Sequence, residues 1–244
     1  MSAADPASQA TNAQLQERVA GVRDRIAAAE QAAERQPGSV HLIAVAKTRD
    51  AQEVRAVATA GVTDIGENYL QEAVAHQDAL QDLPLSWHFI GAVQSNKTRI
   101  LAERFDWVHT VDRAKIARRL SDARAADAAP LDLCIQINLD GEDSKAGVEP
   151  GAAAELVAAI RDLPRVRLRG LMAIPAPRAD AAAQRQALER LATLRDELAA
   201  AHPDLVLDVL SMGMSDDLEA AVAAGATHVR IGTALFGPRP TARP

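Results

Sequence analysis

The sequence predicts a single α/β domain built as a closed (β/α)₈ barrel of the TIM type, and three observations support this fold class. Eight short apolar runs alternate with helix-like segments rich in Ala, Leu, Glu and Arg along 244 residues. No linker-like composition divides the chain, and no Gly-x-Gly-x-x-Gly follows an apolar run, as a dinucleotide-binding open sheet would require. The predicted strands are 40–46, 63–66, 86–91, 107–111, 131–139, 166–174, 205–211 and 227–231.

Composition and charge exclude several classes of protein. The net charge is -6 without a run of like charges, so we expect no nucleic-acid partner. The N-terminus lacks the basic and apolar regions of a signal peptide, and no apolar stretch reaches the roughly 20 residues of a membrane span. We therefore expect a cytoplasmic protein that binds no membrane. The single cysteine, Cys134, lies in an apolar run and is expected to be a buried core residue.

The chain is expected to open with an extra helix in front of the barrel. Thr11 and Gln14 have the spacing of a capping box, and Pro37 with Gly38 must end the helix. Four apolar residues then share one helical face: Leu15, Val19, Val22 and Ile26. We expect residues 1–10 and 238–244 to be flexible termini of a domain spanning the whole chain.

Two later helices carry their own start and stop signals. Asp50 and Glu53 have capping-box spacing, and Gly61 is placed to end the helix that they begin. Gly225 ends a later helix in the same way. Each of these helices is followed by a predicted strand, as a barrel requires.

The residues that follow the predicted strands should share one mouth, because the active site of such a barrel lies at the carboxyl ends of its strands. Each also has an ordinary explanation, such as a helix N-cap or a core histidine bonded to backbone. In chain order these residues are Lys47, Asn68, His88, Asp112, Asn138, Met172, Ser211, Arg230, Gly232 and Thr233.

Lys47 is the candidate nucleophile. The chain has four lysines, and only Lys47 directly follows an apolar strand. A lysine held against an apolar wall loses part of the hydration of its ammonium form, so its pKa falls and the amine can attack aldehydes. The alternative is a solvated lysine that merely closes a strand.

The last two units predict a phosphate site. Ser211-Met212-Gly213-Met214-Ser215 ends the seventh strand, and Gly232-Thr233 follows the eighth. Barrels often bind phosphate between these two loops, where backbone N–H groups and hydroxyls approach the anion. A phosphate site and an aldehyde-reactive amine in one mouth suit pyridoxal 5′-phosphate, with Arg230 facing its ring nitrogen.

Seven segments in this order closely resemble the pyridoxal phosphate homeostasis protein family, which is similar in fold to the barrel domain of alanine racemase. They are Ala44-Val-Ala-Lys-Thr48, Gly66-Glu-Asn-Tyr-Leu-Gln-Glu72, Trp87-His-Phe-Ile-Gly-Ala-Val-Gln-Ser-Asn-Lys97, Ser144-Lys-Ala-Gly147, Gly170-Leu-Met172, Leu210-Ser-Met-Gly-Met-Ser215 and Val229-Arg-Ile-Gly-Thr-Ala-Leu-Phe-Gly237.

The resemblance implies a role for each residue of the mouth. Lys47 would carry the cofactor as an internal aldimine, and Arg230 would meet the ring nitrogen. Ser211, Gly232 and Thr233 would hold the phosphate. The complete set of residues predicted to contact the cofactor is Lys47, Asn68, His88, Met172, Ser211, Met212, Arg230, Gly232 and Thr233.

The same site predicts cofactor binding without established turnover. An arginine beside the pyridine nitrogen keeps that nitrogen unprotonated, which weakens the ring as an electron sink. Alanine racemase adds a tyrosine base from a second domain, whereas the single tyrosine here, Tyr69, does not match it. We therefore expect a monomeric carrier or regulator with no catalytic residue and no metal, meeting apo-enzymes transiently as partners.

Three alternatives stay open at this point. One is a racemase-like enzyme with weak or vestigial activity, and another is a Schiff-base aldolase that uses Lys47 without the cofactor. The third concerns Lys145, which lies in the loop after the fifth predicted strand. It is either a second amine that accepts the cofactor transiently or a solvated loop lysine.

Overall fold

Eight parallel strands form a closed barrel in chain order, which confirms the predicted fold class. The computed structural model describes residues 6–141, 146–178 and 180–238. Lys145 and residues 1–5 and 239–244 lie outside these ranges. The strands are β1 His41–Val45, β2 Asp64–Glu67, β3 Ser86–Phe89, β4 Trp107–Val111, β5 Leu131–Gln136, β6 Val166–Met172, β7 Val209–Ser211 and β8 His228–Ile231.

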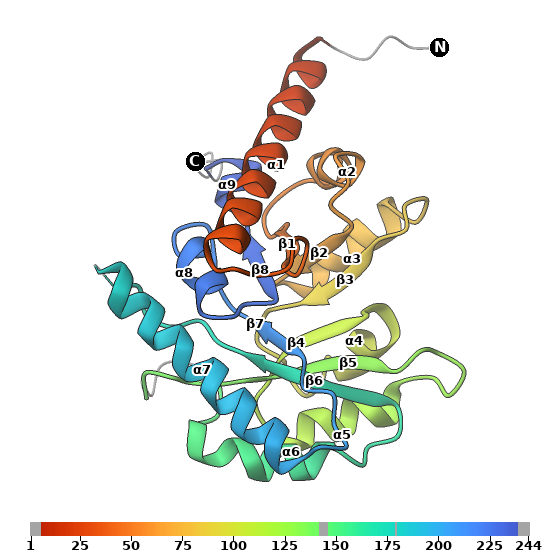
Figure 1. Cartoon of the computed structure of the whole chain (residues 1–244). Coiled ribbons are helices and arrows are strands. Elements are labelled where there is room, and N and C mark those ends of the chain that lie inside the picture. Colours follow the sequence, from red (N-terminus) through yellow and green to blue (C-terminus); the bar gives the residue numbers. More distant parts are fainter. Residues whose placement is uncertain (1–5, 142–145, 179, 239–244) are drawn as a thin grey trace.

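Helices surround the strands on the outside of the barrel (Figure 1). Those described are α1 Pro6–Ala32, α2 Ala51–Thr59, α3 Leu70–Ala79, α4 Thr98–Arg104, α5 Ala114–Ala123, α6 Ala153–Ile160, α7 Ala181–Ala201, α8 Leu218–Ala223 and α9 Thr233–Phe236, with a 3₁₀ turn at Pro150–Ala152. Within the described ranges, no helix has the length and apolar character needed to cross a lipid bilayer.

The helix signals in the sequence are confirmed for α2 and α8. The Asp50 carboxylate accepts hydrogen bonds from the N–H groups of Gln52 and Glu53, and the Glu53 carboxylate accepts one from the Asp50 N–H. Gly61 and Gly225 follow their helices with φ of +88° and +97°. Such left-handed positions favour glycine, so these residues end the helices as predicted.

The N-terminal helix is longer than the sequence suggests. It begins at Pro6 and not at Thr11, so residues 6–10 are helical. Proline suits a helix start because its missing N–H would have no partner in the first turn. The predicted apolar face is buried, and α1 packs against α2, α8 and α9. Arg25 pairs with Glu219 of α8 at 2.7 Å.

Two strands are shorter than predicted by three residues or more. The run 205–211 contributes only Val209–Ser211 to the sheet, and Val206 is exposed. The run 131–139 leaves β5 after Gln136, and Ile137 then forms an isolated bridge with Val148. In both cases the apolar run extends beyond the ladder, because hydrophobicity marks burial as well as strand pairing.

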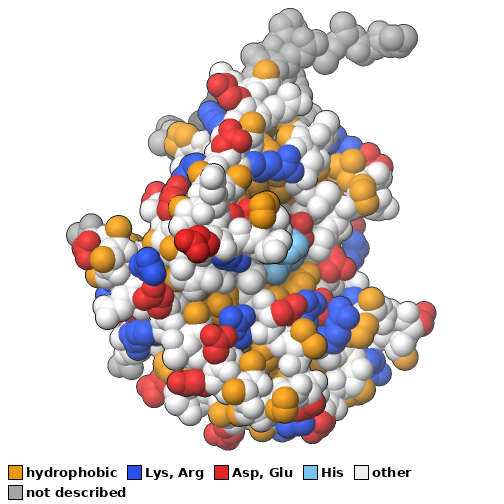
Figure 2. Space-filling model, in the orientation of Figure 1, with side chains coloured by type: hydrophobic (Ala, Val, Ile, Leu, Met, Phe, Trp, Pro, Cys, Tyr) orange, Lys and Arg blue, Asp and Glu red, His pale blue; other side chains and the backbone are white. Residues whose placement is uncertain are grey.

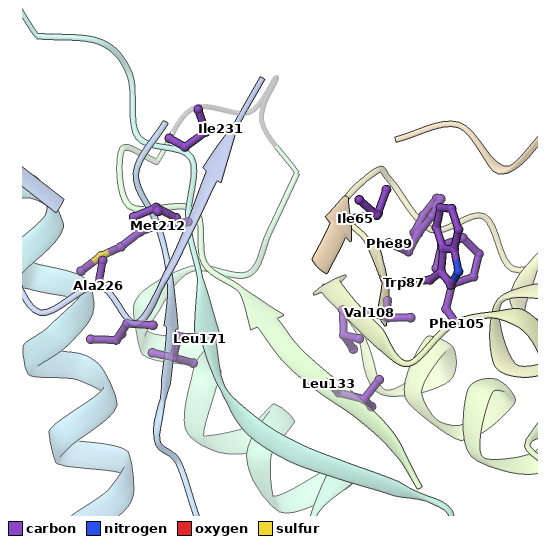
Figure 3. Close-up of a cluster of buried hydrophobic side chains, with 14 of the residues drawn as sticks. Ile65, Trp87, Phe89, Phe105, Val108, Leu133, Leu171, Met212, Ala226 and Ile231 are labelled. Atoms are coloured by element: carbon purple, nitrogen blue, oxygen red, sulfur yellow. The ribbon is translucent and has the colours of Figure 1, made fainter. Parts of the chain in front are cut away.

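Strand side chains alternate between an apolar outer core and the barrel interior. In β3, Trp87 and Phe89 point outward, where the Phe89 ring meets Phe105 edge-on at 5.4 Å (Figure 3). The interior holds a small apolar cluster of Cys134, Met172 and Val209. Cys134 is buried as predicted, and this burial raises the pKa of its thiol. Several polar and charged side chains are also buried in the interior, among them His88, His109, Ser211 and Arg230.

Candidate functional site

Lys47 lies on a strained turn that follows β1. The Arg49 N–H donates to the Ala46 carbonyl at 3.0 Å and closes the turn around Lys47 and Thr48. Thr48 has φ of +63°, a left-handed conformation that is costly for a β-branched residue. Its N–H donates to the Glu72 carboxylate at 2.8 Å, which holds the strained residue in place. The half-buried Lys47 is thereby fixed at the mouth of the barrel.

Buried charged groups support this turn from beneath. The His76 Nε2–H donates to the Arg49 carbonyl at 3.0 Å, while Nδ1 lies 2.7 Å from the Glu67 carboxylate. Burial raises the pKa of Glu67, and the hydrogen bond with Glu67 raises the pKa of His76. The Arg49 guanidinium donates to the carbonyls of Phe236 and Gly237. The Lys47 turn is thus tied to α3 and to the segment after β8.

Asn68 lies beside Lys47 at the same end of the barrel. Val45 pairs with Gly66 across β1 and β2, and Lys47 and Asn68 each follow two residues later. The Asn68 side-chain oxygen is buried, and within the described ranges it has no hydrogen-bond partner. Its backbone oxygen would lie 2.0 Å from a Cβ at Gly91, so glycine is required there. Asn68 therefore offers an unused acceptor next to the candidate nucleophile.

Arg230 is a buried cation whose hydrogen-bond partners are neutral. Its side chain points from β8 into the barrel and is almost fully buried. One guanidinium nitrogen donates to the Ser211 hydroxyl at 2.8 Å, and the other donates to the Ala173 carbonyl at 3.0 Å. Burial lowers the pKa of Arg230 to about 10, with the negative charge of Asp217 opposing the shift. The residue remains charged at neutral pH.

Ser211 does not lie where a phosphate ligand is expected. It is fully buried inside the barrel, where its hydroxyl contacts Arg230 on one side and His109 Nδ1 at 2.8 Å on the other. Ser215, in the loop beyond β7, is only half-buried and accepts a hydrogen bond from the Ala234 N–H of α9. Ser215, and not Ser211, therefore lies beside the start of α9.

The loops after β7 and β8 do meet at the mouth. Gly213 has φ of +93°, and a Cβ there would lie 2.5 Å from the Ala221 Cβ, so the tight loop needs glycine. Gly232 immediately precedes α9, and a Cβ at this position would meet Val45 of β1 at 3.6 Å, an ordinary contact distance. Thr233 begins α9 and is exposed. Gly232 and Thr233 therefore follow the carboxyl end of β8, beside β1, the strand that leads to Lys47.

Three other predicted contacts have different surroundings. His88 lies deeper in the barrel, between His109 and Asp64, so it does not face the mouth. The side chain of Met212 points outward into the apolar outer core (Figure 3), away from the barrel interior. Met172 ends β6 beside Ser211 and points into the barrel interior. The two-residue alternation along a strand is the signal that could have separated Met212 from the inward-facing Ser211.

Comparison of the sequence with known proteins identifies its relatives. Residues 18–240 match the family model of the alanine racemase N-terminal domain. The pyridoxal phosphate homeostasis protein of Pseudomonas aeruginosa is 56% identical over 225 residues, covering 92% of this chain and 96% of that protein. The protein of the same name from Escherichia coli K12 is 49% identical and covers 91% and 95%.

Solved structures agree with this relationship. PipY of Synechococcus elongatus without its cofactor matches at 40% identity and a TM-score of 0.82, covering 91% of this chain and all of PipY. PipY with pyridoxal phosphate bound matches at 39% identity and a TM-score of 0.81. Alanine racemase of Clostridium difficile shares the fold at 12% identity and a TM-score of 0.69, and this chain covers 54% of it. The chain belongs to the alanine racemase N-terminal domain family and, within it, to the family of the pyridoxal phosphate homeostasis proteins.

Proposed function

We propose that this chain binds pyridoxal 5′-phosphate in the mouth of the barrel, attached covalently to Lys47, and serves as a carrier or regulator in the homeostasis of this cofactor. The observation that carries the proposal is Arg230, a buried cation with neutral partners on the same barrel as the strand-end Lys47. A pyridine nitrogen is a neutral acceptor that such a guanidinium can bind. The names of the relatives and the cofactor bound in PipY support the same assignment.

The residues of the mouth fit the separate parts of this cofactor. Lys47 supplies the amine for its aldehyde, and Asn68 supplies a buried polar group beside that amine. Ser215, Gly232 and Thr233 supply hydroxyl and backbone donors for its phosphate, as glycine-containing loops at helix starts commonly do. In this assignment, Ser211 contacts Arg230 and not the phosphate.

We also propose that the protein does not catalyse turnover of amino acids with the bound cofactor. The positive charge of Arg230 disfavours a proton on the ring nitrogen, and an unprotonated ring withdraws fewer electrons from a bound amino acid. Tyr69, the only tyrosine, is 54% exposed at the start of α3, where it is poorly placed to act as a shielded base. The proposal also includes a cytoplasmic, monomeric protein that meets apo-enzymes transiently.

Absorption spectra and proton exchange test the proposal together. Wild type incubated with the cofactor should gain a visible band distinct from free cofactor, Lys47→Ala should not, and the control Lys115→Ala should behave as wild type. Loaded wild type should exchange the α-proton of alanine in deuterated water no faster than free cofactor does. A missing band in wild type would contradict binding, and exchange at an enzymatic rate would favour the racemase-like alternative.

A further inference from the structure

A continuous chain of hydrogen bonds runs through the barrel interior from Arg230 to its opposite end. The Ser211 hydroxyl lies 2.8 Å from the Arg230 guanidinium and 2.8 Å from His109 Nδ1. His109 Nε2 lies 3.0 Å from His88 Nδ1, and His88 Nε2 lies 3.0 Å from the Asp64 carboxylate. The five residues come from β8, β7, β4, β3 and β2, so no single motif contains them.

The donors in this chain all point the same way when both histidines are neutral. Arginine can only donate, so the Ser211 oxygen accepts from Arg230 and its proton is available to His109 Nδ1. His109 must then carry its proton on Nε2, where it donates to His88 Nδ1. His88 must in turn carry its proton on Nε2, where it donates to Asp64. The Ser86 hydroxyl, 3.3 Å from the same nitrogen, is a second acceptor for this proton.

The reverse direction would leave His88 either charged or with a lone pair turned toward the Asp64 carboxylate. If His88 donated from Nδ1 toward His109, its Nε2 would either face an ionised carboxylate with a lone pair or carry a second proton. Burial alone would raise the pKa of Asp64, but its hydrogen bond with His88 and the positive charges around it lower that pKa overall. Burial lowers the pKa of His109 well below its usual value, and the positive charge of Arg230 acts in the same direction.

The far end of the chain opens at the base of the barrel. A pocket of about 350 Å³ there is lined by first residues of strands, including His41, Asp64, Trp107 and His228. Arg169 of β6 also borders it and pairs with Asp208. On the face of the molecule seen in Figure 2, histidine lies near the centre, among acidic and basic side chains. Asp64 is thus in contact with the solvent side while Arg230 is enclosed.

We propose that Asp64, His88 and His109 are positioning residues that hold the Ser211 hydroxyl, and through it the Arg230 guanidinium, in one orientation toward the cofactor ring. This rests on the proposed cofactor site. The Asp64 carboxylate fixes the tautomer of His88, and His88 in turn fixes the tautomer of His109. His109 then accepts the Ser211 proton, so this proton points away from Arg230. Ser211 then presents only lone pairs to the guanidinium, so the remaining N–H groups of Arg230 stay available to the ring nitrogen.

Nitrogen NMR of the histidine rings tests this chain of hydrogen bonds in the absence of the cofactor. The full-length protein with ¹⁵N-labelled histidine should show His88 and His109 as neutral rings with the proton on Nε2 at pH 7. Asp64→Leu should leave His88 with a mixture of tautomers, because the partly exposed carboxylate that orients it is gone. A proton on Nδ1 of either wild-type ring, or a doubly protonated His109, would overturn the proposal.

Cofactor binding tests the consequence for Arg230. His109→Phe should raise the dissociation constant of pyridoxal 5′-phosphate by about tenfold and shift the visible band of the bound cofactor, because the unpartnered serine proton can then turn toward the Arg230 guanidinium, which loses its fixed orientation toward the ring nitrogen. His228→Phe is the matched control, a buried ring outside the hydrogen-bond chain with its centroid 6.3 Å from that of His109, and should change the constant less than about twofold. His109→Gln, which keeps an acceptor and a donor, should restore most of the affinity.

The outcomes of the two experiments are separable. Equal effects of His109→Phe and His228→Phe on the dissociation constant, or no rescue by His109→Gln, would contradict the positioning role. His109 would then act only through packing in the core. If His109→Phe does not fold, Asp64→Leu replaces it in the binding measurement and should weaken binding in the same direction. If wild type binds no cofactor, the proposed function fails, while the tautomer measurement still decides whether the chain is oriented as inferred.

Discussion

Arg230 is the residue on which the electrostatics of the barrel mouth depend. A guanidinium that is only 4% exposed has lost most of its hydration, and two neutral oxygens replace that hydration only in part. An added neutral acceptor from a bound ring would satisfy more of its N–H groups without placing a second charge in the interior. Arg230 therefore favours an unprotonated aromatic nitrogen over a protonated one.

Replacing each of the two serines near the mouth should separate a phosphate ligand from a structural hydroxyl. Ser215→Ala should weaken cofactor binding about tenfold, because hydrogen bonds to charged groups contribute about 1.5–3 kcal/mol, and should leave stability nearly unchanged. Ser211→Ala should lower the free energy of unfolding by about 1–3 kcal/mol, because Arg230 and His109 both lose a buried partner. Cofactor titration and urea unfolding measure the two effects. Equal loss of affinity with unchanged stability in Ser211→Ala would contradict this assignment.

Residue placement could be predicted from the sequence only in part. Lys47, Gly232 and Thr233 follow directly from strand ends, because every strand of a parallel barrel delivers its carboxyl end to one mouth. The roles of Ser211 and His88 could not, since each depends on partners from distant strands. His109 was missed altogether for that reason, as its place between them is visible only when the barrel closes.

At the scale of elements, β6 and β7 approach more closely than any side chain would allow. Gly170 has φ of +157°, and a Cβ there would lie 1.9 Å from the Val209 carbonyl oxygen of the neighbouring strand. β6 also contains a bulge, since Leu133 and Cys134 of β5 pair with Leu168 and Gly170. The glycine lets the bulged strand return to register before Met172 pairs with Ser211 of β7.

Gly170→Ala should therefore destabilise the barrel strongly. The methyl group cannot move away from a backbone oxygen, so β6 and β7 must separate, and we expect a loss of about 3 kcal/mol or more in the free energy of unfolding. Gly21→Ala in α1 is the control, because its Cβ would meet nothing within 4 Å and alanine favours a helix by about 0.5–1 kcal/mol. Urea unfolding monitored by circular dichroism measures both. Similar midpoints for the two variants would contradict the close approach of the strands.

The elements themselves were largely predictable because local chemistry decides them. The capping box at Asp50 and the glycines after α2 and α8 act within a few residues, and all appear as expected. The start of α1 was misplaced because the capping signal at Thr11 competes with a proline five residues earlier. The shortening of β7 depends on where its neighbours end, which no local pattern contains.

On the scale of the whole molecule, the histidines buried inside the barrel make stability depend on pH. Burial lowers the pKa of His228 to about 3. The folded value lies below the unfolded value of about 6.5, so the unfolded state binds more protons between these two values. His109 is shifted in the same direction. Both histidines therefore destabilise the fold as pH falls through this window.

Acid unfolding of wild type should therefore be steeper than that of His228→Phe. A single such histidine contributes up to about 1.4 kcal/mol per pH unit, so the variant should lose less unfolding free energy between about pH 6.5 and pH 4. His76, whose pKa is raised, has the opposite dependence but is present in both proteins and cancels in the comparison. Urea unfolding at several pH values measures the slopes. Parallel curves would show that His228 is not buried in its neutral form.

Attachment of the cofactor to Lys47 underlies every other proposed contact in the mouth, and chemical trapping detects it without relying on activity. Wild type should be loaded with one equivalent of pyridoxal 5′-phosphate, reduced with borohydride, digested and mapped by mass spectrometry. We expect one modified peptide, with the cofactor mass on Lys47, and no modification of that peptide in Lys47→Ala. Stoichiometric modification of another lysine with Lys47 unmodified, or no modified peptide at all, would contradict the attachment.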